Sequence, residues 1–259
     1  MEVARLAALR GHRVTLYEHS AQLGGQLLIA AKAPGRSEML EPIRYYTRQF
    51  QLLGVQVQLG TEVDDAFVQR AAPDAVIVAT GGVPAVPPIE GLVNGTAPGV
   101  HVRLARHVLA GSATVVGDRV IVFTPDQGIE GLSTADFLAE RGKQVEVMVP
   151  YPTVGGAVDM MTQSVLIDRL LQRHVRLRVM TGVSAIRDGT MFAFHPPHGA
   201  EWPVEGVDTL VLAGGTRSDD ALWRRLQGQV KELYAVGDCL APARLVAATQ
   251  SALRVGLEL

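Results

Sequence analysis

Cysteine is almost absent from this sequence of 259 residues, in which Cys239 stands alone. One cysteine excludes an internal disulfide and an iron–sulphur site built from the chain's own thiolates, and it is compatible with a reducing compartment. No apolar run approaches the roughly 20 residues of a membrane-spanning helix, and the first residues lack a charged region followed by an apolar signal core. We therefore expect a cytoplasmic protein without a membrane partner.

The sequence also lacks a surplus of charge of either sign. Its formal net charge is −2, and it contains no long basic or acidic run. Proteins that bind nucleic acid need clustered basic residues, so we expect no nucleic-acid partner and a small-molecule ligand instead. Glycine is abundant, with 27 residues, and 47% of the residues are hydrophobic. This composition is typical of a globular fold with many tight turns between strands and helices.

An early apolar run ends in a carboxylate and is followed by a pair of glycines. Residues 14–17 precede Glu18, and Gly24-Gly25 follow six residues later. A carboxylate at the end of a parallel strand can accept both hydroxyls of a ribose, and glycines let the backbone approach a ligand closely. The pattern predicts a site for an adenine dinucleotide, FAD in the first place. The alternatives are a solvated carboxylate at Glu18 and a simple tight turn at the glycines.

The part of a dinucleotide-binding fold that precedes such a strand has no counterpart in the sequence. Residues 1–11 have the apolar spacing and the terminal glycine of the helix that follows a Gly-x-Gly-x-x-Gly turn. The strand and the turn themselves are missing, and it is the helix after this turn that holds the pyrophosphate. We therefore expect FAD to bind weakly, to be lost, or to be replaced by ADP.

One order of elements occurs twice along the chain. Gly11 separates a predicted helix from the strand at 14–17, and Gly142 separates a second predicted helix from the strand at 145–149. Two strand–helix–strand units in tandem predict a duplicated nucleotide-binding architecture.

Two continuous apolar runs, residues 74–79 and 208–213, predict strands that are buried on both faces, as in a parallel sheet. We predict an α/β fold of two interleaved Rossmann-like dinucleotide-binding domains, each with three layers and a central parallel sheet. The first domain comprises residues 1–115 and 228–259, and the second, residues 116–227, is inserted into it.

Some local elements can also be predicted. Apolar residues at helical spacing predict a helix over 37–53, which Ser37 caps, and a short helix over 102–109. Prolines and glycines predict an irregular crossover over 83–99. A small basic cluster near a strand start is interpreted as a solvated face: Arg173, Arg176 and Arg178.

Four motifs taken together carry a family resemblance. They are Glu18, Leu23-Gly24-Gly25-Gln26, Ala79-Thr80-Gly81-Gly82 and Tyr234-Ala235-Val236-Gly237-Asp238. In order and spacing they resemble the flavoproteins with two dinucleotide-binding domains. The resemblance is to the C-terminal FAD/NAD(P)-binding module of old yellow enzyme-like NADH:flavin oxidoreductases, of the 2,4-dienoyl-CoA reductase and trimethylamine dehydrogenase type. It covers nearly the whole chain.

The resemblance implies cofactor-binding roles for residues in the first two motifs. Glu18 would bind the ribose of the FAD adenosine. Gly24, Gly25 and Gln26 would line the pyrophosphate and the flavin side of the cofactor.

The last two motifs would complete that site. Thr80 and Gly81 would lie against the dinucleotide where the chain crosses to the second domain. Gly237 would place Asp238 near the ribityl chain or the pyrophosphate, at the start of the last helix. The resemblance assigns no catalytic residue and no metal ligand.

The function implied by the resemblance is electron transfer. An FAD-dependent oxidoreductase module would pass electrons between NAD(P)H and a reductase partner, an FMN and iron–sulphur barrel domain that is an N-terminal part or a separate chain. The second domain departs from the family pattern, because Asp126 places bulk and negative charge where a pyrophosphate would approach. This departure argues against NAD(P)H binding.

Two other interpretations remain open. In the first, the chain is a truncated or vestigial scaffold domain that binds ADP, or nothing, without catalysis of its own. In the second, it is a stand-alone reductase that pairs with a separate polypeptide supplying the missing strand.

Overall fold

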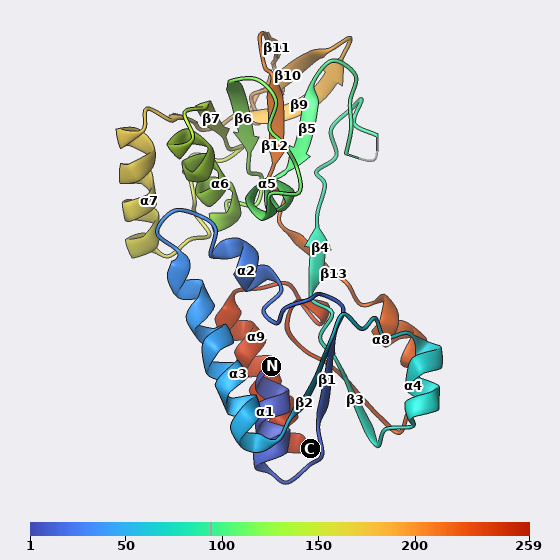
Figure 1. Ribbon diagram of the computed structural model, residues 1–259. Coiled ribbons are helices and arrows are strands. Elements are labelled where there is room, and N and C mark those ends of the chain that lie inside the picture. Colours follow the sequence, from blue (N-terminus) through green and yellow to red (C-terminus); the bar gives the residue numbers. More distant parts are fainter. Residues whose placement is uncertain (94) are drawn as a thin grey trace. The chain divides into compact units, whose positions relative to one another are not determined.

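The computed structural model describes residues 1–93 and 95–259, which form two compact units (Figure 1). Unit 1 consists of Met1–Leu28, Glu38–Val83 and Thr216–Leu259, and unit 2 of Ile29–Ser37 and Pro84–Gly215. Of the predicted crossover, Asn94 lies outside the described residues.

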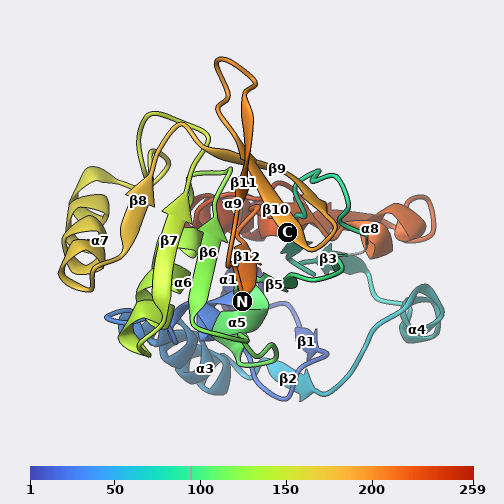
Figure 2. The same ribbon diagram turned by 90° about the horizontal axis from the view of Figure 1, so that it is seen from above.

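Unit 2 is built on a parallel sheet of five strands in the order β5-β12-β6-β7-β8, which Figure 2 shows side by side. The strands are β5 (His101–Leu104), β12 (Thr209–Leu212), β6 (Arg119–Phe123), β7 (Gln144–Met148) and β8 (Arg176–Arg178). The central strand β6 lies between β12 and β7, and four of its five residues are buried. This continuous burial explains why its sequence is an unbroken apolar run.

The two faces of this sheet pack against different layers. Val120 and Val122 of β6 face the helices α5 (Ala105–Ala110), α6 (Ile129–Glu140) and α7 (Met160–Gln172). Ile121 and Phe123 face an antiparallel sheet formed by β9 (Gly182–Arg187), β10 (Thr190–Phe194) and β11 (Glu201–Val204). Successive side chains of a strand point to opposite faces, so one apolar run serves both layers. The predicted α/β fold with a central parallel sheet is confirmed.

Unit 1 has four parallel strands, which form two separate pairs. The pairs are β1 (Thr15–Glu18) with β2 (Gln56–Leu59), and β3 (Ala75–Val78) with β14 (Glu232–Ala235). Its helices are α1 (Glu2–Leu9), α3 (Glu41–Leu53), α4 (Asp65–Ala71), α8 (Ala221–Leu226) and α9 (Leu245–Glu258). One core joins Val3 of α1 to Ala252 and Val255 of α9, and another joins α4, β3 and α8.

The remaining elements are short. They are α2 (Gln26–Ala30), the 3-10 turns η1 (Ser37–Leu40) and η2 (Gly237–Cys239), and the paired strands β4 (Gly82–Pro84) and β13 (Thr216–Ser218). Within the described residues, every helix is too short or too polar to cross a membrane. The cytoplasmic location stays a prediction.

Two local predictions need correction. The helix predicted over 37–53 begins as the 3-10 turn η1, and α3 starts only at Glu41. Pro42 lies in the first turn of α3. N–H groups in the first turn have no partner within the helix, so the missing N–H of proline costs no helical hydrogen bond there. The helix predicted over 102–109 begins at Ala105, because residues 101–104 pair with β12 as a strand.

The unit boundaries also differ from the predicted domain boundaries. Residues 84–115 lie in unit 2, because β5 pairs with β12 and α5 packs in the same core as α6. Residues 216–227 lie in unit 1, where Leu226 packs with Val68 and Val78. The assignment of a nucleotide to each domain stays a prediction.

Candidate dinucleotide site

The carboxylate of Glu18 lies at the end of β1 in a fixed orientation. Its Oε1 accepts a hydrogen bond of 2.7 Å from the backbone N–H of Ser20 and lies 2.9 Å from Nδ1 of His19. The side chain is 22% exposed, and within the described residues its Oε2 accepts no hydrogen bond. Because one oxygen is held by the chain, the other can face a ligand hydroxyl.

Gln26 connects the ends of two other strands of unit 1. Its Nε2 donates to the carbonyl oxygen of Gly82, which follows β3, and to Oδ2 of Asp238, which follows β14, both at 3.3 Å. Oδ1 of Asp238 accepts a hydrogen bond of 3.2 Å from the N–H of Ala243. The structure therefore brings together two predicted site residues, Gln26 and Asp238, at the carboxyl ends of β3 and β14.

Gly237 and Thr80 also lie at the carboxyl ends of β14 and β3, and each forms a hydrogen bond to another segment of the chain. Gly237 has a positive φ of 64°, and its N–H donates to Oγ of Ser251 on α9 at 3.0 Å. Ser251 is not among the predicted site residues, and its only signal in the sequence is a hydroxyl beside the buried Ala252 on α9. The Thr80 hydroxyl donates to the carbonyl oxygen of Asp219, so it joins the end of β3 to the segment between β13 and α8.

The predicted glycines divide into two kinds. A Cβ on Gly24 would lie 2.3 Å from Cδ1 of Ile43, so this glycine permits close packing against α3, and its role beside a cofactor stays a prediction. A Cβ on Gly25 would meet no atom within 4 Å, and one on Gly81 would meet only Nε2 of Gln26, at 3.9 Å. Both have positive φ values. Gly25 and Gly81 therefore fit a backbone that a cofactor approaches closely.

In unit 2, the turn between β6 and α6 is closed by its own side chains. Oδ1 of Asp126 accepts hydrogen bonds of 3.0 Å from the Thr124 hydroxyl and from the N–H of Gly128. Gln127 has a positive φ of 54°, and its Oε1 accepts a hydrogen bond of 2.8 Å from the N–H of Gly156. Free N–H groups at such a helix start would otherwise bind a phosphate. These residues do not fit a pyrophosphate.

A second carboxylate stands in the first turn of α6. Burial raises the pKa of Glu130, Arg106 at 3.7 Å opposes that rise, and the negative charge of Asp126 adds to it. A helix start normally attracts anions. Here the carboxyl groups of Asp126 and Glu130 occupy it, which makes the turn unfavourable for a phosphate.

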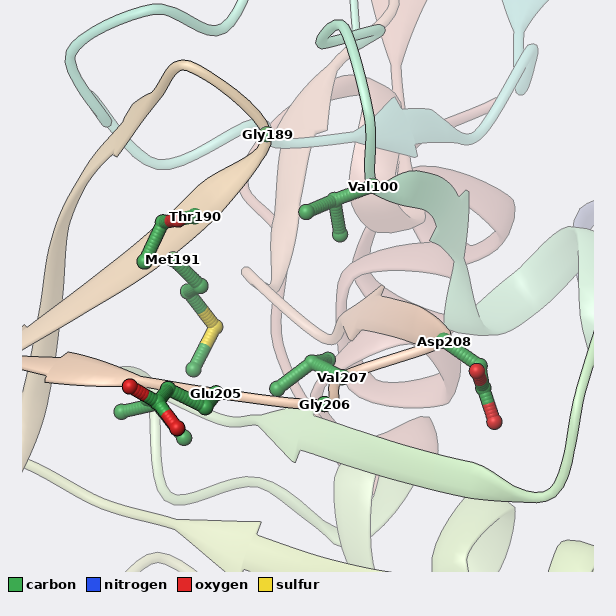
Figure 3. A pocket seen from close by; sticks show the side chains of 9 residues that line it. Val100, Gly189, Thr190, Met191, Glu205, Gly206, Val207 and Asp208 are labelled. Atoms are coloured by element: carbon green, nitrogen blue, oxygen red, sulfur yellow. The ribbon is translucent and has the colours of Figure 1, made fainter.

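Unit 2 also contains a cavity of about 400 Å³ at the amino end of β12 (Figure 3). The side chain of Asp208 points away from Met191. Its Oδ2 accepts hydrogen bonds of 2.8 and 2.9 Å from the N–H groups of Asp118 and Arg119, which lower the pKa of Asp208. Ligands of parallel sheets bind at the carboxyl ends of the strands, so this cavity lies at the opposite end from a dinucleotide site.

The sequence matches a known family over almost its whole length. Residues 1–254 match the pyridine nucleotide-disulphide oxidoreductase family. The chain belongs to this family. It corresponds to the C-terminal FAD/NAD(P)-binding part of larger relatives.

Two curated relatives and one solved structure illustrate this family membership. The chain is 30% identical to N,N-dimethylglycine/sarcosine dehydrogenase of Chromohalobacter salexigens, over 98% of this chain and 42% of the relative. It is 34% identical to bilirubin reductase of Mediterraneibacter gnavus, over 92% of this chain and 36% of that relative. It superposes on a structure of 2-naphthoyl-CoA reductase in complex with 2-naphthoyl-CoA with a TM-score of 0.89. The sequence identity is 30%, and the superposition covers 100% of this chain and 38% of the reductase chain.

These family members are much longer than the chain, which spans about two fifths of their length. Their names describe oxidoreductases, whose activities belong to the complete proteins. The roles of the predicted site residues stay predictions, because the comparisons concern whole chains and not single residues.

Proposed function

We propose that unit 1 binds FAD and that the chain is the dinucleotide-binding module of a flavin-dependent oxidoreductase. The observation that carries this proposal is the arrangement of polar groups at strand ends. Glu18 presents one carboxylate oxygen at the end of β1, and Gln26 joins Asp238 to Gly82 at the ends of β14 and β3. The oxidoreductase relatives support it.

The predicted site residues of unit 1 that follow have defined roles in this proposal. Glu18 accepts the ribose hydroxyls of the adenosine half, and Gln26 keeps Asp238 in place. Gly25 and Gly81 admit the cofactor close to the backbone. Bound FAD supplies the redox chemistry, while the protein supplies position and electrostatics. In a complete enzyme the module exchanges electrons with a flavin and iron–sulphur partner domain, N-terminal or on a separate chain.

A second candidate function is a scaffold that binds ADP without catalysis. The turn between β6 and α6 in unit 2 favours it, because the carboxylate of Asp126 and the side chain of Gln127 are held there by the chain, where the pyrophosphate of a nicotinamide donor would approach. ADP and FAD share the adenosine diphosphate half, so Glu18 has the same role in both proposals.

The deciding experiment is a titration of the purified chain with FAD and with ADP, followed by flavin absorbance and calorimetry. If FAD binds at one equivalent and at least about tenfold more tightly than ADP, contacts beyond the shared half contribute about 1.4 kcal/mol or more. That result supports the FAD module. Equal affinities support the ADP scaffold, and no binding of either ligand contradicts both.

The closed turn of unit 2 predicts that the chain does not bind NADH or NADPH with a Kd below about 1 mM. Calorimetry with each nucleotide checks this. The double variant Asp126→Gly/Glu130→Gln opens the turn and removes both carboxylates, so nucleotide binding should improve by at least about tenfold, as expected for two like-charge contacts near a phosphate. Asp188→Asn, on an exposed turn of the same unit, is the control and should change nothing. Tight binding by the unaltered chain would refute the prediction.

A further inference from the structure

One short helix belongs to both units of the chain. Helix α2 begins with Gln26 in unit 1, and its last two residues belong to unit 2. The segment 31–37, which follows α2, also belongs to unit 2. Gln26 is the residue whose amide donates to Asp238 and to Gly82 in the candidate site. The contacts that hold the segment 31–37 can therefore act on the candidate site through the chain.

Turn hydrogen bonds connect the candidate site with this segment. Before, within and after α2, backbone N–H groups donate to the carbonyl oxygen three residues earlier, at distances of 3.0 to 3.2 Å. The donors are Leu27, Leu28, Lys32, Ala33 and Arg36. Bonds of this kind fix the backbone of each turn. The stretch from Gly24 to Arg36 is therefore a series of closed turns, and a displacement at one end is carried toward the other.

Two hydrogen bonds hold the segment 31–37 to helices of unit 2. Nζ of Lys32 donates to the carbonyl oxygen of Ala110, the last residue of α5, at 2.6 Å. Lysine side chains often bind the free carbonyl oxygens at the end of a helix. Nη2 of Arg169 on α7 donates to the carbonyl oxygen of Pro34 at 2.8 Å. Between these two contacts Ala33 is buried, with 4% of its surface exposed.

Arg169 is itself fixed by a second contact. Its guanidinium forms an ion pair with the carboxylate of Asp136, which has no solvent exposure. Arginine presents several donors in a rigid fork, so one side chain can bind this carboxylate and the Pro34 carbonyl together. Gly35 has a positive φ of 67°, and a Cβ there would lie 2.6 Å from Nη1 of Arg169. The segment and α7 are therefore in close contact at this point.

We propose that Lys32 and Arg169 are positioning residues for the flavin half of the dinucleotide site. They fix the segment after α2, and α2 in turn sets the place of the Gln26 side chain beside Asp238. This inference rests on the proposed FAD site of unit 1. When the segment is loosened, Gln26 leaves Asp238, and the affinity for FAD falls more than the affinity for ADP. The reason is that ADP lacks the ribityl chain and the flavin.

Two substitutions loosen the segment at different points. Lys32→Met keeps most of the length of the side chain and removes the donor to the Ala110 carbonyl. Lys32 is exposed, so this variant should fold even if the other does not. Gly35→Ala places a methyl group against the Arg169 guanidinium and so breaks its bond to Pro34.

Unit 2 offers a matched control for each substitution. Nζ of Lys143 donates to the carbonyl oxygen of Gly117 at 2.6 Å, so Lys143→Met removes the same charge and the same kind of bond elsewhere. Gly142 has a positive φ of 79°, and a Cβ there would meet no atom within 4 Å. Gly142→Ala therefore reproduces the backbone strain of Gly35→Ala without the displaced arginine.

NMR on the full chain without ligand gives the first readout. In Lys32→Met and in Gly35→Ala, the side-chain amide signals of Gln26 should shift. The backbone amide of Leu28 should exchange at least about threefold faster, because local opening becomes easier. The two control variants should match the unaltered chain. This readout needs no dinucleotide, so it still decides the positioning of Gln26 if FAD does not bind, a result that contradicts only the proposed function.

Titration calorimetry with FAD and with ADP gives the second readout. Lys32→Met and Gly35→Ala should each weaken FAD binding about fivefold, as expected for the loss of one hydrogen bond, and ADP binding less than about twofold. Lys32→Arg keeps a donor and should restore the affinity for FAD. Three results would overturn the proposal: unchanged Gln26 signals and Leu28 exchange in both test variants, controls that behave like the test variants, or an equal loss of FAD and ADP affinity.

Discussion

Replacing Glu18 with Gln should weaken the binding of FAD and of ADP to the chain by about 10- to 100-fold. A hydrogen bond to a charged group contributes about 1.5–3 kcal/mol, and the neutral amide of glutamine has one acceptor oxygen where the carboxylate has two. The backbone N–H of Ser20 holds Oε1 at 2.7 Å, so the substitution changes the charge of a group that is already oriented. Titration calorimetry with both nucleotides measures the loss.

Glu62→Gln is the matched control, because Glu62 is an exposed residue of the same unit and loses the same charge. It should leave both affinities unchanged, and the Tm of both variants should stay near that of the unaltered chain. If the two substitutions weaken binding equally, long-range charge and not a ribose contact is responsible. If neither has an effect, Glu18 is the solvated strand-end carboxylate that the sequence also allowed.

Replacing Asp136 with Ala should lower the free energy of unfolding by about 3 kcal/mol, because removal of one partner leaves buried charge unpaired. Asp136 lies on α6 with no solvent exposure, and its carboxylate forms ion pairs with Arg169 of α7 and with Arg173, the residue that caps the end of α7. These arginine side chains are 26% and 29% exposed, so water offsets part of the loss. Urea unfolding followed by circular dichroism measures the change.

The control for Asp136 is a pair on the surface. Glu41 and Arg44 form an ion pair in which both side chains are more than 60% exposed. Glu41→Gln should cost less than about 0.5 kcal/mol, since such pairs contribute little in water. A similar small loss for Asp136→Ala would mean that apolar packing alone, and not the ion pair, joins α6 to α7.

The basic cluster shows the limit of reading charge from sequence. The prediction that Arg173, Arg176 and Arg178 form a solvated face holds for Arg176 and Arg178, which are exposed. It misses the ion pairs, because Arg173 pairs with Asp136 and Arg178 pairs with the buried Glu146. The acidic partners lie more than 30 residues away along the chain. Local sequence cannot show which distant carboxylate a given arginine meets.

The surroundings of the two glycines in the candidate site could not be predicted from local sequence either. Gly24 and Gly25 are adjacent and look alike in sequence, yet one faces Ile43 and the other faces open space. The helix predicted over 102–109 starts three residues too early for a related reason. Residues 101–104 have helical spacing in the sequence, but in the structure they pair with β12 as a strand.

The sequence by itself determined the fold class, the repeat of strand and helix, and the carboxylate at the end of β1. These features are local, since a strand buried on both faces is an apolar run and its end is marked by the next polar or glycine residue. Only the tertiary structure decided the contact of Gln26 with Asp238, which are 212 residues apart, and the closure of the unit 2 turn by Asp126 and Gln127. Those features depend on where distant segments meet and on side-chain direction, which no local pattern encodes.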